Sequence, residues 1–151
     1  EFYYGFHRAM PLSVRFTPDE FMLQTDMQVG AHAWLMQNQH LASLEREFGA
    51  ERVRFLNGDT LLANRAQTLS RVAAFFGFSL DARAADEIAA GPAFEENAKL
   101  PGAQFDAQAY GALQQQVNAL HGDELSKAEA WAQALAQRSG APILLSETLF
   151  D

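Results

Sequence analysis

The chain has 151 residues, of which 20% are charged, and its formal net charge at pH 7 is −8. This length suits one domain with its own core, so we expect residues 1–151 to form a single domain or a fragment of a longer one. The acidic excess argues against a nucleic-acid or anionic-membrane surface, because clustered Lys and Arg hold phosphate groups. The absence of Cys excludes disulfides and thiolate metal sites, and no apolar run is long enough to span a bilayer.

The N-terminal segment is rich in aromatic residues. Phe2, Tyr3 and Phe6 fall on one side of an expected helix that ends at Pro11. Since the chain opens without Met or a basic-then-apolar leader, we expect a piece of a longer protein or a processed chain, with the cytoplasm as the default compartment.

A second helix is predicted to begin at Thr17-Pro18-Asp19-Glu20, which combines a Thr cap, a Pro in the first turn and a Glu three residues after the cap. Gly30 is expected to break this helix before another one, which ends at Gly49. His32 and His40 lie eight residues apart on that helix, with no carboxylate at a matching position between them. This spacing disfavours a joint metal site, and a polar cleft or a half-exposed helix explains both residues.

The segment from Arg52 to Phe78 is the one around which we expect the fold to be organised. Val53 and Phe55, which alternate with two Arg residues, predict a short strand followed by a turn at 57–59. Asn64 can cap a helix that ends at Gly77 in a left-handed conformation. The segment therefore predicts a strand-to-helix corner of an α/β protein. Arg52 and Arg54, the only close pair of cations in it, are expected to be solvated.

The C-terminal half is predicted to be mostly helical. Asp81 is expected to cap a helix that Gly91-Pro92 ends, and His121-Gly122 is expected to separate two later helices. Each of these two carries one apolar stripe; in the first it consists of Tyr110, Leu113, Val117 and Leu120. Residues 143–145 are expected to form a last short strand.

Several of these residues match a known pattern. The runs Leu61-Leu62-Ala63-Asn64 and Val72-Ala73-Ala74-Phe75-Phe76-Gly77-Phe78 resemble the sulfotransferase arrangement of a strand, an acidic turn, a Leu-Leu-Ala-Asp-Pro-like cap and a helix ending in Phe-Leu-Gly-Leu. Residues 2–10, followed by Thr17 to Phe21, look like the segment after the Arg-Asp-Pro signature of the same family. The resemblance covers the C-terminal half of that family only.

The resemblance implies a fold, a reaction and a cofactor. The fold would be the C-terminal part of a P-loop-type sulfotransferase, helix-rich α/β with one or two strands of a parallel sheet. The parent chain would transfer a sulfuryl group from 3'-phosphoadenosine 5'-phosphosulfate (PAPS) to a hydroxyl or amine of a small-molecule or carbohydrate acceptor, without a metal. No Gly-rich, Lys-bearing loop is present, and the family's catalytic base lies in its N-terminal half, so no catalytic residue is assigned.

One residue of this chain is implied as a donor ligand. A loop downstream of the Phe-Leu-Gly-Leu helix holds the donor's 3'-phosphate in the family, and by resemblance Lys99 would do so here. An exposed surface ammonium is the other interpretation, because Glu95 and Glu96 are its charged neighbours. His7 is interpreted as an ordinary surface or boundary His rather than a base.

The alternative function belongs to another class. The chain would be a non-catalytic helical interaction module, whose aromatic first helix and acidic surface bind a protein partner.

Binding of the donor product separates the two hypotheses. If the sulfotransferase hypothesis holds, adenosine 3',5'-bisphosphate should bind the full-length protein saturably in titration calorimetry. Lys99→Ala should weaken that binding, because it removes a cation from the 3'-phosphate site. Absence of binding by a folded, full-length protein would favour the interaction module instead.

Overall fold

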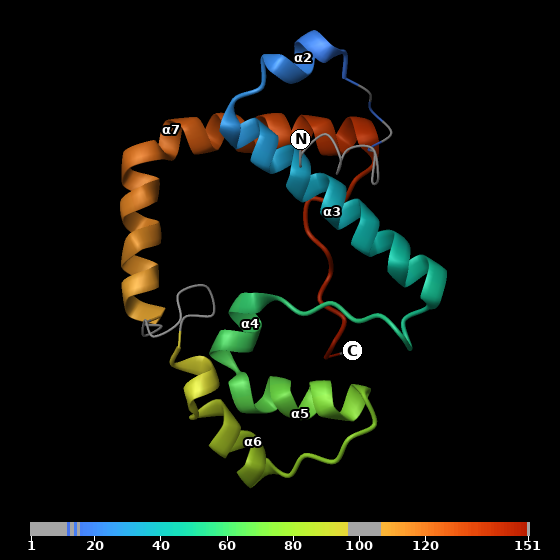
Figure 1. Ribbon diagram of the computed structural model, residues 1–151, viewed down its shortest axis with the longest axis vertical. Helices are drawn as coiled ribbons and strands as arrows, with labels where there is room; N and C mark the ends of the chain where they lie inside the picture. The colour runs from blue at the N-terminus through green and yellow to red at the C-terminus, as the bar shows by residue number, and fades with distance from the viewer. Residues whose placement is uncertain (1–11, 13, 15, 97–106, 151) are drawn as a thin grey trace. The chain divides into compact units, whose positions relative to one another are not determined.

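The computed structural model describes residues 12, 14, 16–96 and 107–150 (Figure 1). The described residues form these helices: α2 (Pro18–Met22), α3 (Asp26–Phe48), α4 (Gly58–Ala63), α5 (Arg65–Phe75), α6 (Ala82–Ala89), the 3-10 turn η1 (Pro92–Phe94) and α7 (Ala107–Ser139). The chain divides into two compact units. Unit 1 comprises Glu1–Val53 and Val117–Ser146, and unit 2 comprises Arg54–Gln116 and Glu147–Asp151.

Two capping boxes start the first helices of unit 1. The Thr17 hydroxyl accepts a hydrogen bond from the backbone N–H of Glu20, and the Glu20 carboxylate accepts one from the backbone N–H of Thr17 at 2.7 Å. This backbone bond, with a second from the Thr17 hydroxyl, lowers the pKa of Glu20 from its ordinary value. Thr25 and Gln28 repeat the arrangement at the start of α3. The predicted cap at Thr17 is therefore confirmed.

Two expected helix breaks are wrong. Helix α3 continues through Gly30, and α7 continues through His121 and Gly122 as one helix of 33 residues. A Gly inside a helix costs only about 1 kcal/mol relative to Ala. Because each added residue of a formed helix gains a backbone hydrogen bond, one Gly is too weak a signal to end it. The predicted end at Gly49 is confirmed, and its φ is +85°.

The core of unit 1 lies between α3 and the C-terminal part of α7, which cross each other in Figure 1. Leu35 and Met36 of α3 are fully buried against Leu135 and Ala136 of α7. Leu12 and Ala141 complete the buried cluster, and Phe16 and Trp131 are among the half-buried side chains that pack on it.

Two side chains of α3 hold the segment that follows α7. The buried amide of Asn38 donates to the backbone oxygens of Pro142, at 3.3 Å, and Ile143, at 2.7 Å. The indole N–H of Trp34 donates to the same oxygen of Ile143 at 3.0 Å. These bonds connect residues more than 100 positions apart in the sequence and fix the course of residues 141–143 along α3.

Unit 2 contains α4, α5, α6, η1, the part of α7 up to Gln116, and the residues from Glu147 onward. Asn57 caps α4 by accepting from the N–H of Asp59, and Asp81 caps α6 by accepting from the N–H of Ala84. Helix α5 starts after Asn64, as predicted, but no side-chain capping bond forms there. At its other end Gly77 has a φ of +75°, and the N–H of Phe78 bonds to the oxygen of Ala73. This is a Schellman-type ending, and it confirms the predicted role of Gly77. The hydrogen bond from Ala84 confirms the predicted cap at Asp81.

The predicted α/β fold with strands of a parallel sheet is wrong, because the described residues contain no β-strand. At the first expected strand, the N–H of Phe55 donates to the Thr148 hydroxyl, and its oxygen accepts from the N–H groups of Thr148 and Leu149. Arg54 donates to the Thr148 oxygen at 3.1 Å. A side chain and a turn therefore take the backbone groups that a neighbouring strand would use.

The second expected strand, residues 143–145, is wrong for the same physical reason. The backbone bends at Ile143 and Leu144. The oxygen of Ile143 is engaged by two side-chain donors of α3, so it is not part of a ladder of backbone hydrogen bonds.

The two donors of α3 should differ in their contribution to stability. We expect Asn38→Ala to lower the free energy of unfolding by about 1–3 kcal/mol, because the backbone oxygen of Pro142 loses its donor and that of Ile143 keeps only the indole N–H of Trp34. Trp34→Phe removes one bond at a half-exposed side chain and should cost less. Urea unfolding followed by circular dichroism measures both, and a larger loss for Trp34→Phe would contradict the assigned roles.

Candidate functional site

Lys99, implied as a ligand of the donor's 3'-phosphate, and His7, interpreted as a surface or boundary His, lie outside the described part of the chain. So do Phe2, Tyr3 and Phe6 of the expected aromatic helix. Their predicted roles stay predictions.

The two cations of the organising segment lie in different environments. Arg52 is exposed, as expected, whereas Arg54 is half-buried and donates to the Thr148 oxygen. Arg54 therefore has a structural task within unit 2, where it helps to fix the end of the chain.

The two histidines of α3 are also separated. The ring of His32 is fully buried among the rings of Phe16, at 5.0 Å between centroids, Phe21, at 5.8 Å, and Trp131, at 6.4 Å. His40 is exposed. Sequence reasoning placed both on a half-exposed helix, and it missed that His32 belongs to an aromatic cluster. Within the described ranges, no group of three or more acidic or His side chains is placed to hold a metal ion.

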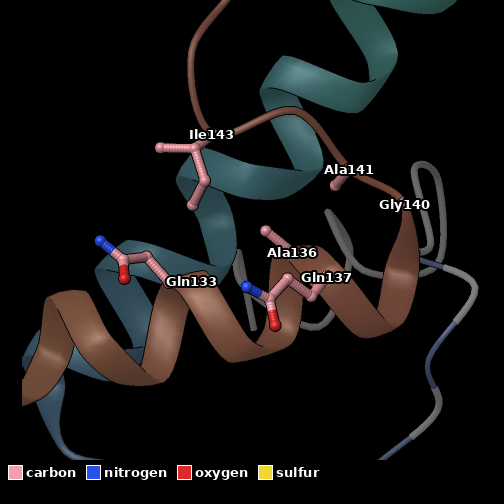
Figure 2. Close-up of a pocket in the computed structure, with 6 residues that line it drawn as sticks. All are labelled: Gln133, Ala136, Gln137, Gly140, Ala141 and Ile143. Atoms are coloured by element: carbon pink, nitrogen blue, oxygen red, sulfur yellow. The ribbon is translucent and has the colours of Figure 1, made fainter.

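A shallow pocket of about 340 Å³ lies at the C-terminal end of α7 (Figure 2). Figure 2 shows Gln133, Ala136 and Gln137 on the helix, and Gly140, Ala141 and Ile143 on the chain that follows it. The lining offers two amide side chains and apolar groups but no titratable side chain. This pocket can therefore offer hydrogen bonds and apolar contact, but no general acid or base.

A stripe of exposed apolar side chains lies on the N-terminal part of α7. Its four members are exposed, to 49% for Tyr110, 56% for Leu113, 40% for Val117 and 69% for Leu120. They are separated by three, four and three residues, so they share one face of the helix. We call this set the α7 stripe.

The α7 stripe lies in a run without charge. From Ala107 to Leu120 the helix carries no Asp, Glu, Lys or Arg, and between the stripe residues stand Gln114, Gln115, Gln116 and Asn118 among smaller residues. The next position at heptad spacing after Val117 is Glu124. The uncharged apolar face thus covers about two heptads and ends at a carboxylate.

Sequence reasoning found the stripe but interpreted it as a packing face between two helices. The periodicity of an exposed stripe equals that of a buried one, so the sequence pattern predicts the face and not its exposure. Neutral Gln and Asn at the flanks are the signal that could have drawn attention to it, because a solvent-facing helix surface usually carries charges.

No protein-family model, curated protein or solved structure matches this chain. Nothing in these comparisons identifies a sulfotransferase. In the described residues, no helix is both long enough and apolar enough to cross a bilayer.

The exposure of the α7 stripe can be tested by stability. The double variant Leu113→Gln, Leu120→Gln keeps helix propensity and removes two exposed apolar side chains, so each change should alter the free energy of unfolding by no more than about 0.5 kcal/mol. The buried-residue control Leu35→Ala should cost about 2–5 kcal/mol. Urea unfolding at low protein concentration gives both values, and a loss for the double variant as large as that of the control would show that the stripe is part of a core.

Proposed function

We propose that this chain is a helical protein-interaction module and that the α7 stripe binds an amphipathic helix of a protein partner. The observation that carries the proposal is the exposure of four large apolar side chains at heptad spacing on one helix. Burying such side chains against a partner helix gains about 25 cal/mol per Å² of apolar surface. The stripe is therefore more stable in contact with a partner helix than in contact with water.

The geometry of the stripe favours a helix as the partner. Side chains separated by three and four residues form a straight seam along an α-helix, and a second helix with the same period can place its side chains between them. The flanking amides fit this use, because they offer hydrogen bonds at the rim without the desolvation cost of a charge.

The sulfotransferase hypothesis stays a prediction. Its support is the local resemblance of Leu61–Asn64 and Val72–Phe78 to the family pattern, together with the helix that ends at Gly77. PAPS as donor, Lys99 at its 3'-phosphate, and a small-molecule or carbohydrate acceptor all belong to that hypothesis.

A designed helix tests the proposed module. The probe is a fluorescent 28-residue peptide with Leu at the a and d positions and Gln at the e and g positions, used at nanomolar concentration. Its anisotropy should rise saturably with the wild-type chain, and the double variant Leu113→Gln, Leu120→Gln should lose this binding because the seam is interrupted.

Two controls accompany this titration. A peptide of the same composition in which the heptad order is scrambled should not bind, and Leu144→Gln should bind as well as wild type. Leu144 is exposed to 74% and lies outside α7, so it removes a similar apolar side chain elsewhere. Equal binding by wild type and the double variant would refute the α7 stripe as the surface.

A further inference from the structure

We infer that Asn57 is a site of spontaneous deamidation, in which it forms a succinimide with the peptide nitrogen of Gly58 at a rate set by opening of the start of α4. Five Asn residues occur in the sequence, and Asn57 is the one that is followed by Gly. Both residues are exposed, and both belong to unit 2. Because Gly has no Cβ, no side chain of residue 58 hinders the approach of its nitrogen to the neighbouring amide.

The reaction needs only these two residues and water. The Gly58 nitrogen gives its proton to a base in the solvent and attacks Cγ of Asn57, which forms a new C–N bond. The bond between Cγ and Nδ2 breaks, and Nδ2 takes up a proton and leaves as ammonia. Water then opens the five-membered ring. Opening at Cγ gives an aspartate, and opening at the backbone carbonyl gives an isoaspartate, whose main chain runs through Cγ. No atom is oxidised or reduced.

The cap of α4 opposes this ring closure. Asn57 has a ψ of 134°, and its Oδ1 accepts a hydrogen bond from the N–H of Asp59 at 2.9 Å. In a succinimide the Gly58 nitrogen lies close to one plane with Cβ and Cγ of Asn57, whereas the extended backbone turns that nitrogen away from Cβ. The cap must therefore open, and Asn57 must rotate about its Cα–C bond, before the nitrogen can attack.

Opening of this cap is a local change. Helix α4 has six residues, none of them buried, and isolated helices of this length are marginal in water. Two hydrogen bonds to the Glu147 carboxylate hold it, from the N–H of Asn57 at 3.4 Å and from the Thr60 hydroxyl at 3.0 Å. Short exposed elements open at a fraction of the free energy of global unfolding. The folded chain should therefore react more slowly than the unfolded chain, but at a measurable rate.

The two products change α4 in different ways. An aspartate keeps an oxygen that can accept from the N–H of Asp59, but it adds a negative charge beside Asp59 and Glu147. An isoaspartate lengthens the main chain by one methylene group. The oxygens that now accept from the N–H groups of Asp59 and Leu61 are then displaced relative to each other. The isoaspartate product should therefore loosen the start of α4.

Peptide mapping by mass spectrometry, after incubation of the folded chain at 37 °C and neutral pH, tests this inference. The tryptic peptide of residues 55–65 contains both Asn57 and Asn64, so its fragment ions distinguish the two in one measurement. The mass at Asn57 should rise by about 1 Da, because an oxygen replaces an N–H group. Asn64, which precedes Arg65, should keep its amide over the same time and serves as the internal control.

Two variants test the chemistry and the role of the cap separately. Gly58→Ala should slow the reaction by about tenfold or more, because a side chain hinders the attacking nitrogen and restricts the backbone. A Cβ at this position meets no atom within 4 Å, so the variant should keep the fold. Thr60→Val keeps the shape of the side chain and removes its bond to Glu147. It should speed the reaction about fivefold, because the start of α4 opens more often.

The outcomes are distinct. Deamidation at Asn57 that Gly58→Ala suppresses and Thr60→Val accelerates would support the inference. An Asn57 amide that stays intact in the folded chain, while the chain unfolded in urea deamidates, would overturn it. Equal rates in the folded and unfolded chains, or an unchanged rate in Thr60→Val, would refute control by the opening of α4. Deamidation of Asn64 to the same extent would refute the assignment to the Asn57–Gly58 pair.

Discussion

Unit 1 depends on the contact between α3 and the C-terminal part of α7. Leu35 and Met36 are excluded from water by the buried cluster to which Leu135 and Ala136 of α7 belong. The same crossing brings Asn38 within hydrogen-bond distance of the segment after α7. Apolar burial therefore sets the position of the helices, and the buried amide then selects one course for the chain, since another course would leave its N–H groups without acceptors.

The same use of side chains explains why extended segments do not become strands. A strand needs a neighbour that offers backbone groups at regular intervals. Here the backbone groups of Phe55 are taken by Thr148 and Leu149, and the oxygen of Ile143 by donors of α3. The Thr60 hydroxyl also donates to the Glu147 carboxylate at 3.0 Å. Side chains and one turn of the backbone therefore satisfy these polar groups, and no ladder of strand hydrogen bonds forms between them.

The sequence predicts the local features of this fold and not the long-range ones. The caps at Thr17 and Asp81 and the left-handed Gly77 were predicted because their causes lie within a few residues. The strand at Val53 and the break at Gly30 were wrong because local preferences of about 1 kcal/mol compete with tertiary contacts that a short window does not contain. The burial of His32 depends on Phe16 and Phe21, which precede α3, and on Trp131 of α7, which is distant in the sequence.

For the α7 stripe too, the sequence predicted the spacing of the apolar residues but not their exposure. The helical spacing of Leu113, Val117 and Leu120 was evident in the sequence. The same spacing occurs on a helix face that packs inside its own fold, on one that binds another protein and on one exposed to water. The surrounding residues distinguish these cases. An isolated solvent-facing helix gains from alternating charges, and an internal core face needs no particular flanks. Fourteen residues without a charge, in a chain of net charge −8, fit a helix whose apolar face is covered only when another molecule is present.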